Sequence, residues 1–201
     1  MSPPTPVLDL SGNLATLAAA LVGTVPELGH IDLRRVLFAV SRSRAEGLHG
    51  VYARISPLAF AGGAKEWTRQ RGRYREIFRL PTLNHQGREI RYVITLLIPR
   101  FLRLGFEQKL QTIIHELYHI SEACDGDIRR FPGRNFAHGS SRHAYNRQVA
   151  AMADRFLAAD PDPGLLRALH LGEADWSERR LRITGLTIPL PQAKLVARER
   201  W

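Results

Sequence analysis

The strongest structural signal in this chain of 201 residues lies in residues 90–124, IRYVITLLIPRFLRLGFEQKLQTIIHELYHISEAC. Residues 90–98 carry a large apolar side chain at every second position, which predicts a strand with one strongly apolar face. Pro99 ends this pattern. From 106 to 124 the large apolar side chains recur instead at three- and four-residue steps, which predicts a helix with one buried stripe. Gly126 is a suitable residue to end that helix.

The predicted helix contains the pentapeptide HELYH at residues 115–119. Histidines four residues apart lie on one face of a helix, so the ring nitrogens of His115 and His119 can bind a single Zn²⁺. Glu116 between them suits a general base that takes a proton from water at the metal. This pattern favours a zinc-dependent peptide hydrolase. The alternative is that both histidines are ordinary solvent-exposed side chains, since they fall opposite the predicted stripe.

A catalytic zinc usually takes three protein ligands, so a further donor is expected from another part of the chain. We favour His138, because a loop residue just before a second helix can fold back over the first one. His143, already inside that second helix, is an alternative. Asp125 has the spacing of the elongated metzincin motif, but that motif has glycine where this chain has Glu122. We interpret Glu122 as a supporting residue or a surface ion-pair partner rather than a ligand.

Weaker patterns predict the remaining elements. Apolar runs at 36–40 and 51–55 predict two more strands. Three further segments predict helices: residues 14–22, the segment marked by an apolar stripe of Tyr145, Val149, Met152 and Phe156, and residues 165–171. Residues 180–190 predict an edge strand.

These elements together predict an α+β fold of minimal zincin type, with a small mixed or antiparallel sheet packed against the HExxH helix. We expect three parts. Residues 1–25 form an N-terminal extension with a short helix, residues 26–158 the zincin-like metallopeptidase domain, and residues 159–201 an accessory segment.

Several short motifs in this region resemble those of one protein family. They are His115 to Ile120, Asp125-Gly126-Asp127, Arg129-Arg130-Phe131 and Ala137-His138-Gly139-Ser140. Across Pro26 to Leu157 the chain resembles the phage-type metallopeptidases and, more distantly, the SprT-like zinc proteases, in which a His-Gly pair supplies the third ligand. The resemblance implies that His115, His119 and His138 bind the metal and that Glu116 is catalytic. SprT-like proteins often carry a cysteine-rich zinc ribbon, whereas this chain has only Cys124.

The chain is strongly basic, with a net charge of +10. Basic residues are densest between 67 and 79, where Arg69, Arg71, Arg73, Arg75 and Arg79 mingle with Trp67, Tyr74 and Phe78. Guanidinium groups bind phosphates and aromatic rings stack on bases, so this stretch is a candidate nucleic-acid contact. The alternative is a solvated loop or edge strand whose charges prevent aggregation.

A single cysteine excludes an intramolecular disulfide, which favours the reducing cytoplasm. The apolar run at 14–22 is too short to cross a bilayer, and the first ten residues show no signal-peptide pattern, so no membrane association is expected.

Three functional hypotheses follow from the sequence. The first is a zinc metallopeptidase that acts on protein or peptide substrates. The second is a non-enzymatic, arginine-rich nucleic-acid-binding protein. The third is a regulatory protein whose zinc site is closed by a fourth protein ligand, which would leave no position for water.

Overall fold

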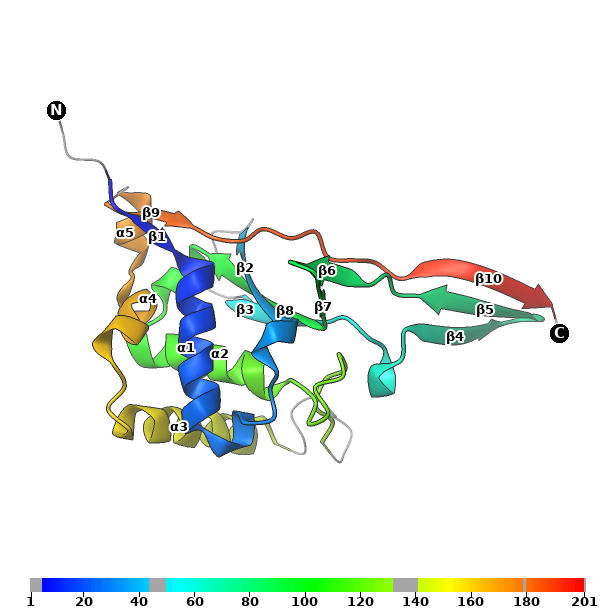
Figure 1. Cartoon of the computed structure of the whole chain (residues 1–201), viewed down its shortest axis with the longest axis horizontal. Coiled ribbons are helices and arrows are strands. Elements are labelled where there is room, and N and C mark those ends of the chain that lie inside the picture. The colour runs from blue at the N-terminus through cyan, green and yellow to red at the C-terminus, as the bar shows by residue number, and fades with distance from the viewer. Residues whose placement is uncertain (1–4, 44–49, 132–140, 179, 201) are drawn as a thin grey trace.

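The computed structural model describes residues 5–43, 50–131, 141–178 and 180–200 and has an α+β fold. Helices gather at one end of the molecule and a slender sheet projects from the other (Figure 1). The helices are α1 (Leu10–Thr24), α2 (Phe106–Tyr118), α3 (Arg142–Ala158), α4 (Arg167–His170) and α5 (Glu173–Ser177). The strands are β1 (Val7–Asp9), β2 (Val36–Arg42), β3 (Ala53–Pro57), β4 (Glu66–Arg71), β5 (Tyr74–Arg79), β6 (Leu83–His85), β7 (Arg88–Ile90), β8 (Tyr92–Ile98), β9 (Arg182–Thr184) and β10 (Lys194–Arg200).

The central sheet has the strand order β2-β8-β3, with β8 parallel to β2 and antiparallel to β3. Its three strands confirm those predicted near 36–40, 51–55 and 90–98. The middle strand is the most apolar because it is covered on both faces. Tyr92, Ile94, Leu96 and Ile98 lie in the main core, while Val93 faces a smaller apolar cluster on the other side.

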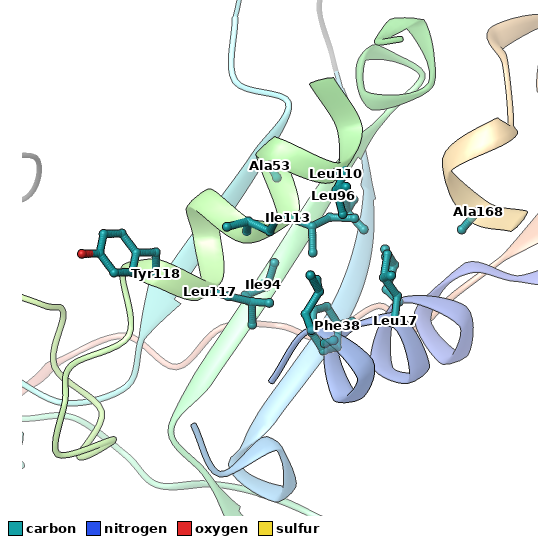
Figure 2. Close-up of a cluster of buried hydrophobic side chains, with 14 of the residues drawn as sticks. Leu17, Phe38, Ala53, Ile94, Leu96, Leu110, Ile113, Leu117, Tyr118 and Ala168 are labelled. Atoms are coloured by element: carbon teal, nitrogen blue, oxygen red, sulfur yellow. The ribbon is translucent and has the colours of Figure 1, made fainter. Parts of the chain in front are cut away.

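The main core lies between one face of this sheet and the helices. Leu17 of α1, Phe38 of β2 and Ile94 of β8 converge there, and Ile113 and Leu117 of α2 approach from the other side (Figure 2). The four apolar residues predicted to mark the second helix are all buried in α3, which confirms its stripe. Large buried aliphatic and aromatic side chains of this kind each contribute about 1.5–3 kcal/mol when they leave water.

Helix α2 is shorter than predicted, which corrects the expected end near Gly126. It ends at Tyr118, and the chain then turns, with the Cys124 amide donating to the Ser121 carbonyl at 2.9 Å. Ile120 and Cys124 are nevertheless buried, because the turn returns them to the core. The three- and four-residue spacing therefore predicted the burial of Ile120 and Cys124 correctly, although the helix ends before them.

The N-terminal and C-terminal segments contribute to the same body. Five residues of α1 are buried in the main core, and so are Ala168 and Leu169 of α4. The predicted helix at 165–171 is present as a 3₁₀ turn followed by α4. Of the expected strand at 180–190, β9 forms and pairs in parallel with β1, and Leu186 makes an isolated parallel bridge to Ala39 of β2. The division into three parts at residues 25 and 158 remains a prediction.

The arm, defined here as β4, β5 and β10, is a separate antiparallel sheet of order β10-β5-β4 that extends away from the helices (Figure 1). The sequence pattern did not predict β10. Within the described part of the chain, no helix is both long enough and apolar enough to cross a membrane.

Candidate metal centre

The HExxH residues lie at the C-terminal end of α2, where the helix reaches the turn after Tyr118. His119 is the C-cap residue and only 6% of it is exposed, and His115 is half-buried. Their Nε2 atoms lie 3.0 Å apart. The two rings are therefore not two independent surface side chains, and their imidazole nitrogens point at a common place.

This spacing fits two ligands of one zinc ion. Two nitrogens that each lie about 2.0–2.1 Å from a tetrahedral zinc are about 3.3 Å apart. Imidazole nitrogen is also a donor that zinc prefers. Among the residues that the structure describes, no cluster of three or more His, Cys, Asp or Glu side chains forms around this pair.

The candidates for the third ligand have different positions. His138 lies outside the described residues. His143 is exposed in the first turn of α3. The Asp125 carboxylate accepts hydrogen bonds from the Ser121 hydroxyl at 2.6 Å and the Asp127 amide at 3.1 Å, so it is engaged in the turn after α2. The Glu122 side chain is 82% exposed and pairs with Arg129, as expected for a surface ion pair.

Glu116 is buried beside the histidines and is oriented by the central sheet. Its Oε2 atom accepts a hydrogen bond from the Ile55 amide of β3 at 2.7 Å. Burial raises the pKa of the Glu116 carboxyl to about 7, and the hydrogen bond from Ile55 partly opposes that shift. A carboxyl group with a pKa near the working pH can accept and return a proton with little energetic cost.

Tyr145 of α3 packs against both histidine rings. Its ring is stacked on His119 with centroids 5.5 Å apart and meets His115 edge-on at 5.0 Å. Its hydroxyl donates a hydrogen bond to the His115 carbonyl at 3.3 Å, and burial raises the pKa of this phenol above its ordinary value. Tyr145 thus ties α3 to the last turn of α2 and restricts the orientation of the imidazoles.

A cavity of about 380 Å³ opens beside His115 and Glu116. It lies between α2, α3 and the start of β3, and polar side chains form much of its wall. These are Gln108, Gln111 and Thr112 of α2 and Asn146 of α3. The HExxH motif alone does not mark the two glutamines as part of the site. Their spacing of four and seven residues before His115 would have placed them on the same helical face.

Within the stretch expected to contact nucleic acid, the proposed contact residues Arg69, Arg71, Arg73 and Arg75 do not share one surface. Arg69 and Arg71 lie on β4, Arg73 follows in the turn and Arg75 lies on β5. Arg69 pairs with Glu76, and Arg71 is opposite Tyr74. Arg75 is opposite Gln70, which places its side chain on the other face of the hairpin.

Comparison with known proteins adds evidence for one family. No curated protein and no solved structure is significantly similar to the chain. Residues 11–155 match the family described as "Putative phage metallopeptidase". That range contains nearly all of α1, the central sheet, the HExxH residues and most of α3. Because the match spans more than two thirds of the sequence, the chain belongs to the phage metallopeptidase family.

Proposed function

We propose that the protein is a zinc-dependent metallopeptidase that hydrolyses peptide bonds at the C-terminal end of α2. In this proposal His115, His119 and His138 hold the metal and Glu116 is the general base. The observation that carries the proposal is the convergence of two imidazole Nε2 atoms, 3.0 Å apart, beside the buried Glu116 carboxyl group, which accepts a hydrogen bond from the Ile55 amide. Membership of a metallopeptidase family also supports it.

The chemistry divides between the metal and the protein. A zinc ion held by His115, His119 and His138 would supply Lewis-acid chemistry, which lowers the pKa of water toward about 7. Glu116 accepts the proton of the attacking water and then donates it to the leaving amine. The hydrogen bond from the Ile55 amide holds the carboxylate in place during both transfers. A base positioned in this way contributes roughly 10²- to 10⁴-fold to the rate.

The cavity offers a place for the substrate. It lies beside Ala53 of β3, and β3 is an edge strand of the central sheet. An extended peptide can pair with such an edge through main-chain hydrogen bonds. Polar groups of Gln108, Gln111 and Asn146 are available on the opposite wall for the peptide backbone or side chains.

The test is a cleavage assay on labelled casein combined with metal analysis of the purified protein. Glu116→Gln should retain zinc but lose about 10²- to 10⁴-fold in rate, because an amide cannot accept the proton. His119→Ala should lose the metal as well. Glu122→Gln is the matched control, since it removes an exposed carboxylate six residues further along, and its rate should stay close to that of the wild type.

Two outcomes would overturn this proposal. Equal turnover by Glu116→Gln and the wild type would exclude Glu116 as the base. A zinc-loaded wild-type protein whose metal is bound by four protein ligands would instead support the closed regulatory site.

The third ligand has its own test. His138→Ala should reduce the zinc content and weaken zinc affinity, while His143→Ala and Asp125→Asn should leave both nearly unchanged. Loss of zinc in His143→Ala or Asp125→Asn with retention in His138→Ala would reassign the ligand.

A further inference from the structure

The arm is a sheet that covers no hydrophobic core. All six residues of β4 and six of the seven residues of β10 are exposed. Most sheets bury at least one face against another layer, because otherwise too little apolar surface leaves water. The arm also contains eight basic and three acidic residues in strands β4, β5, β10 and the β4–β5 turn. Its surface is therefore strongly cationic and accessible from both sides.

The pairing register separates the side chains of the arm onto two faces. Residues directly opposite one another in antiparallel strands lie on the same face. One face, called here the aromatic face, carries the rings of Trp67, Tyr74 and Phe78. The same face carries four arginines from the two outer strands. They are Arg69 and Arg71 of β4 and Arg198 and Arg200 of β10.

Rings and guanidinium groups alternate on the aromatic face and contact each other. The Arg69 guanidinium lies 5.1 Å from the centre of the Phe78 ring, and the Arg198 guanidinium lies 4.1 Å from the centre of the Tyr74 ring. Glu76 is the acidic residue in the middle of this face, and it pairs with Arg69 at 2.7 Å and with Arg198 at 3.7 Å. One carboxylate against four guanidinium groups leaves the face with an excess of positive charge.

The opposite face has a different composition. Arg75, Arg79 and Lys194 lie there with Glu66 and Glu199, and it carries no aromatic ring among the described residues of the arm. Its charge is close to balanced, because Arg79 pairs with Glu66 at 2.6 Å and Glu199 lies opposite Arg75.

We propose that the aromatic face of the arm binds single-stranded nucleic acid. Arg71 and Arg200 would contact phosphates, since no ion pair to a described carboxylate engages either of them. Trp67, 46% exposed, would stack on a base. Single strands are bound by this combination of a cationic surface and accessible rings. An acidic peptide could satisfy the arginines but presents no planar bases to the rings, so the nucleic acid fits the face better.

The two faces supply a matched pair of variants. Arg71→Ala/Arg200→Ala and Arg75→Ala/Lys194→Ala each remove two positive charges from the arm, but from opposite faces. Binding of the full chain to a fluorescein-labelled oligothymidylate of about 20 nucleotides is measured by anisotropy over a range of salt concentrations.

We expect the first pair to weaken binding about tenfold or more and to reduce the slope of log affinity against log salt by about 1.4, because two phosphate contacts are lost. The second pair should change affinity no more than about threefold. Trp67→Ala should weaken binding about tenfold with little change in salt slope, because stacking releases no counterions. Circular dichroism of each variant checks that the arm remains folded.

Three outcomes would overturn the proposal. The first is equal loss of affinity in both double variants, which would indicate a general effect of charge. The second is that both Trp67→Ala and Arg71→Ala/Arg200→Ala bind the oligonucleotide as tightly as the wild type. The third is competition by polyglutamate as effective as by unlabelled oligothymidylate, which would indicate an acidic protein partner. The proposal does not depend on the peptidase chemistry, so Glu116→Gln should bind the oligonucleotide as the wild type does.

Discussion

The helical body and the arm are stabilised in different ways. In the body, α1, α2 and α3 bury apolar side chains against the central sheet, and the candidate metal centre lies where α2 and α3 meet. In the arm, cross-strand ion pairs and contacts between arginines and rings link strands that bury little. The candidate metal centre therefore lies on the part of the molecule that has a buried core, and the accessible charged surface lies on the part where few described side chains are buried.

The largest difference in stability is expected from large-to-small substitutions in the two regions. Phe156→Ala removes a ring that is 1% exposed in α3 and should lower the free energy of unfolding by about 3–5 kcal/mol. Trp67→Ala removes a larger ring from the arm and should cost less than about 1.5 kcal/mol, because that ring is already half in water. Urea unfolding followed by circular dichroism measures both. Equal decreases in the free energy of unfolding would mean that the arm depends on buried apolar side chains as much as the body does.

An intermediate effect is expected at the turn that follows α2. Asp127 accepts hydrogen bonds from the amides of Gly62 at 2.9 Å and Ile128 at 2.8 Å and pairs with Arg130 at 3.0 Å. Burial alone would raise the pKa of this carboxyl, but the hydrogen bonds from Arg130, Gly62 and Ile128 hold it below its ordinary value. Asp127→Asn should lower the free energy of unfolding by about 1–3 kcal/mol at neutral pH.

This effect should depend on pH in a defined direction. A carboxyl whose pKa is lower in the folded state contributes its full stability above the ordinary Asp pKa of about 3.9 and loses it as the pH falls through the folded value. Unfolding of the wild type and Asp127→Asn should therefore differ most near neutral pH and converge in acid. A difference that grows as the pH falls would contradict the assignment.

The smallest effect on global stability is expected from Glu76→Gln in the arm. The hydrogen bond from Arg69 holds the pKa of Glu76 below its ordinary value, so the carboxylate is charged at neutral pH and links β4 to β10 through Arg69 and Arg198. The variant should speed amide hydrogen exchange in β4, β5 and β10 and leave the unfolding midpoint of the body unchanged. Glu66→Gln, which removes the partner of Arg79 on the opposite face, serves as a comparison. Faster exchange in α2 would show that the two regions unfold together.

The central strands and the longer helices of the body could be predicted from the sequence because their side chains follow a local period. The alternation at 90–98 gives β8, and the stripe through Tyr145 and Phe156 gives α3. The end of α2 could not be predicted in the same way. Ile120 and Cys124 continue the helical spacing, but the chain turns after Tyr118 and buries them from a different backbone conformation. Periodicity reports which side chains are buried, and several backbone paths can bury the same set.

The arm was harder to predict because its third strand comes from far along the chain. Lys194 to Arg200 has no alternating apolar pattern, and among the described strands it pairs with β5, more than a hundred residues earlier. The adjacency of Arg198 and Arg200 to the arginines of β4 depends on that pairing. For the site, the sequence placed His115, Glu116 and His119 together, whereas the Ile55 amide that orients Glu116 is a main-chain group that no side-chain motif encodes.

The pairing order of the arm also bears on how copies of the chain meet in solution. Strands β4 and β10 are the outer strands, and an outer strand is a template to which a second molecule can add. Here each template is lined with guanidinium groups, so two copies aligned edge to edge would bring like charges together. This charge thus disfavours edge-to-edge pairing between the arms of two copies.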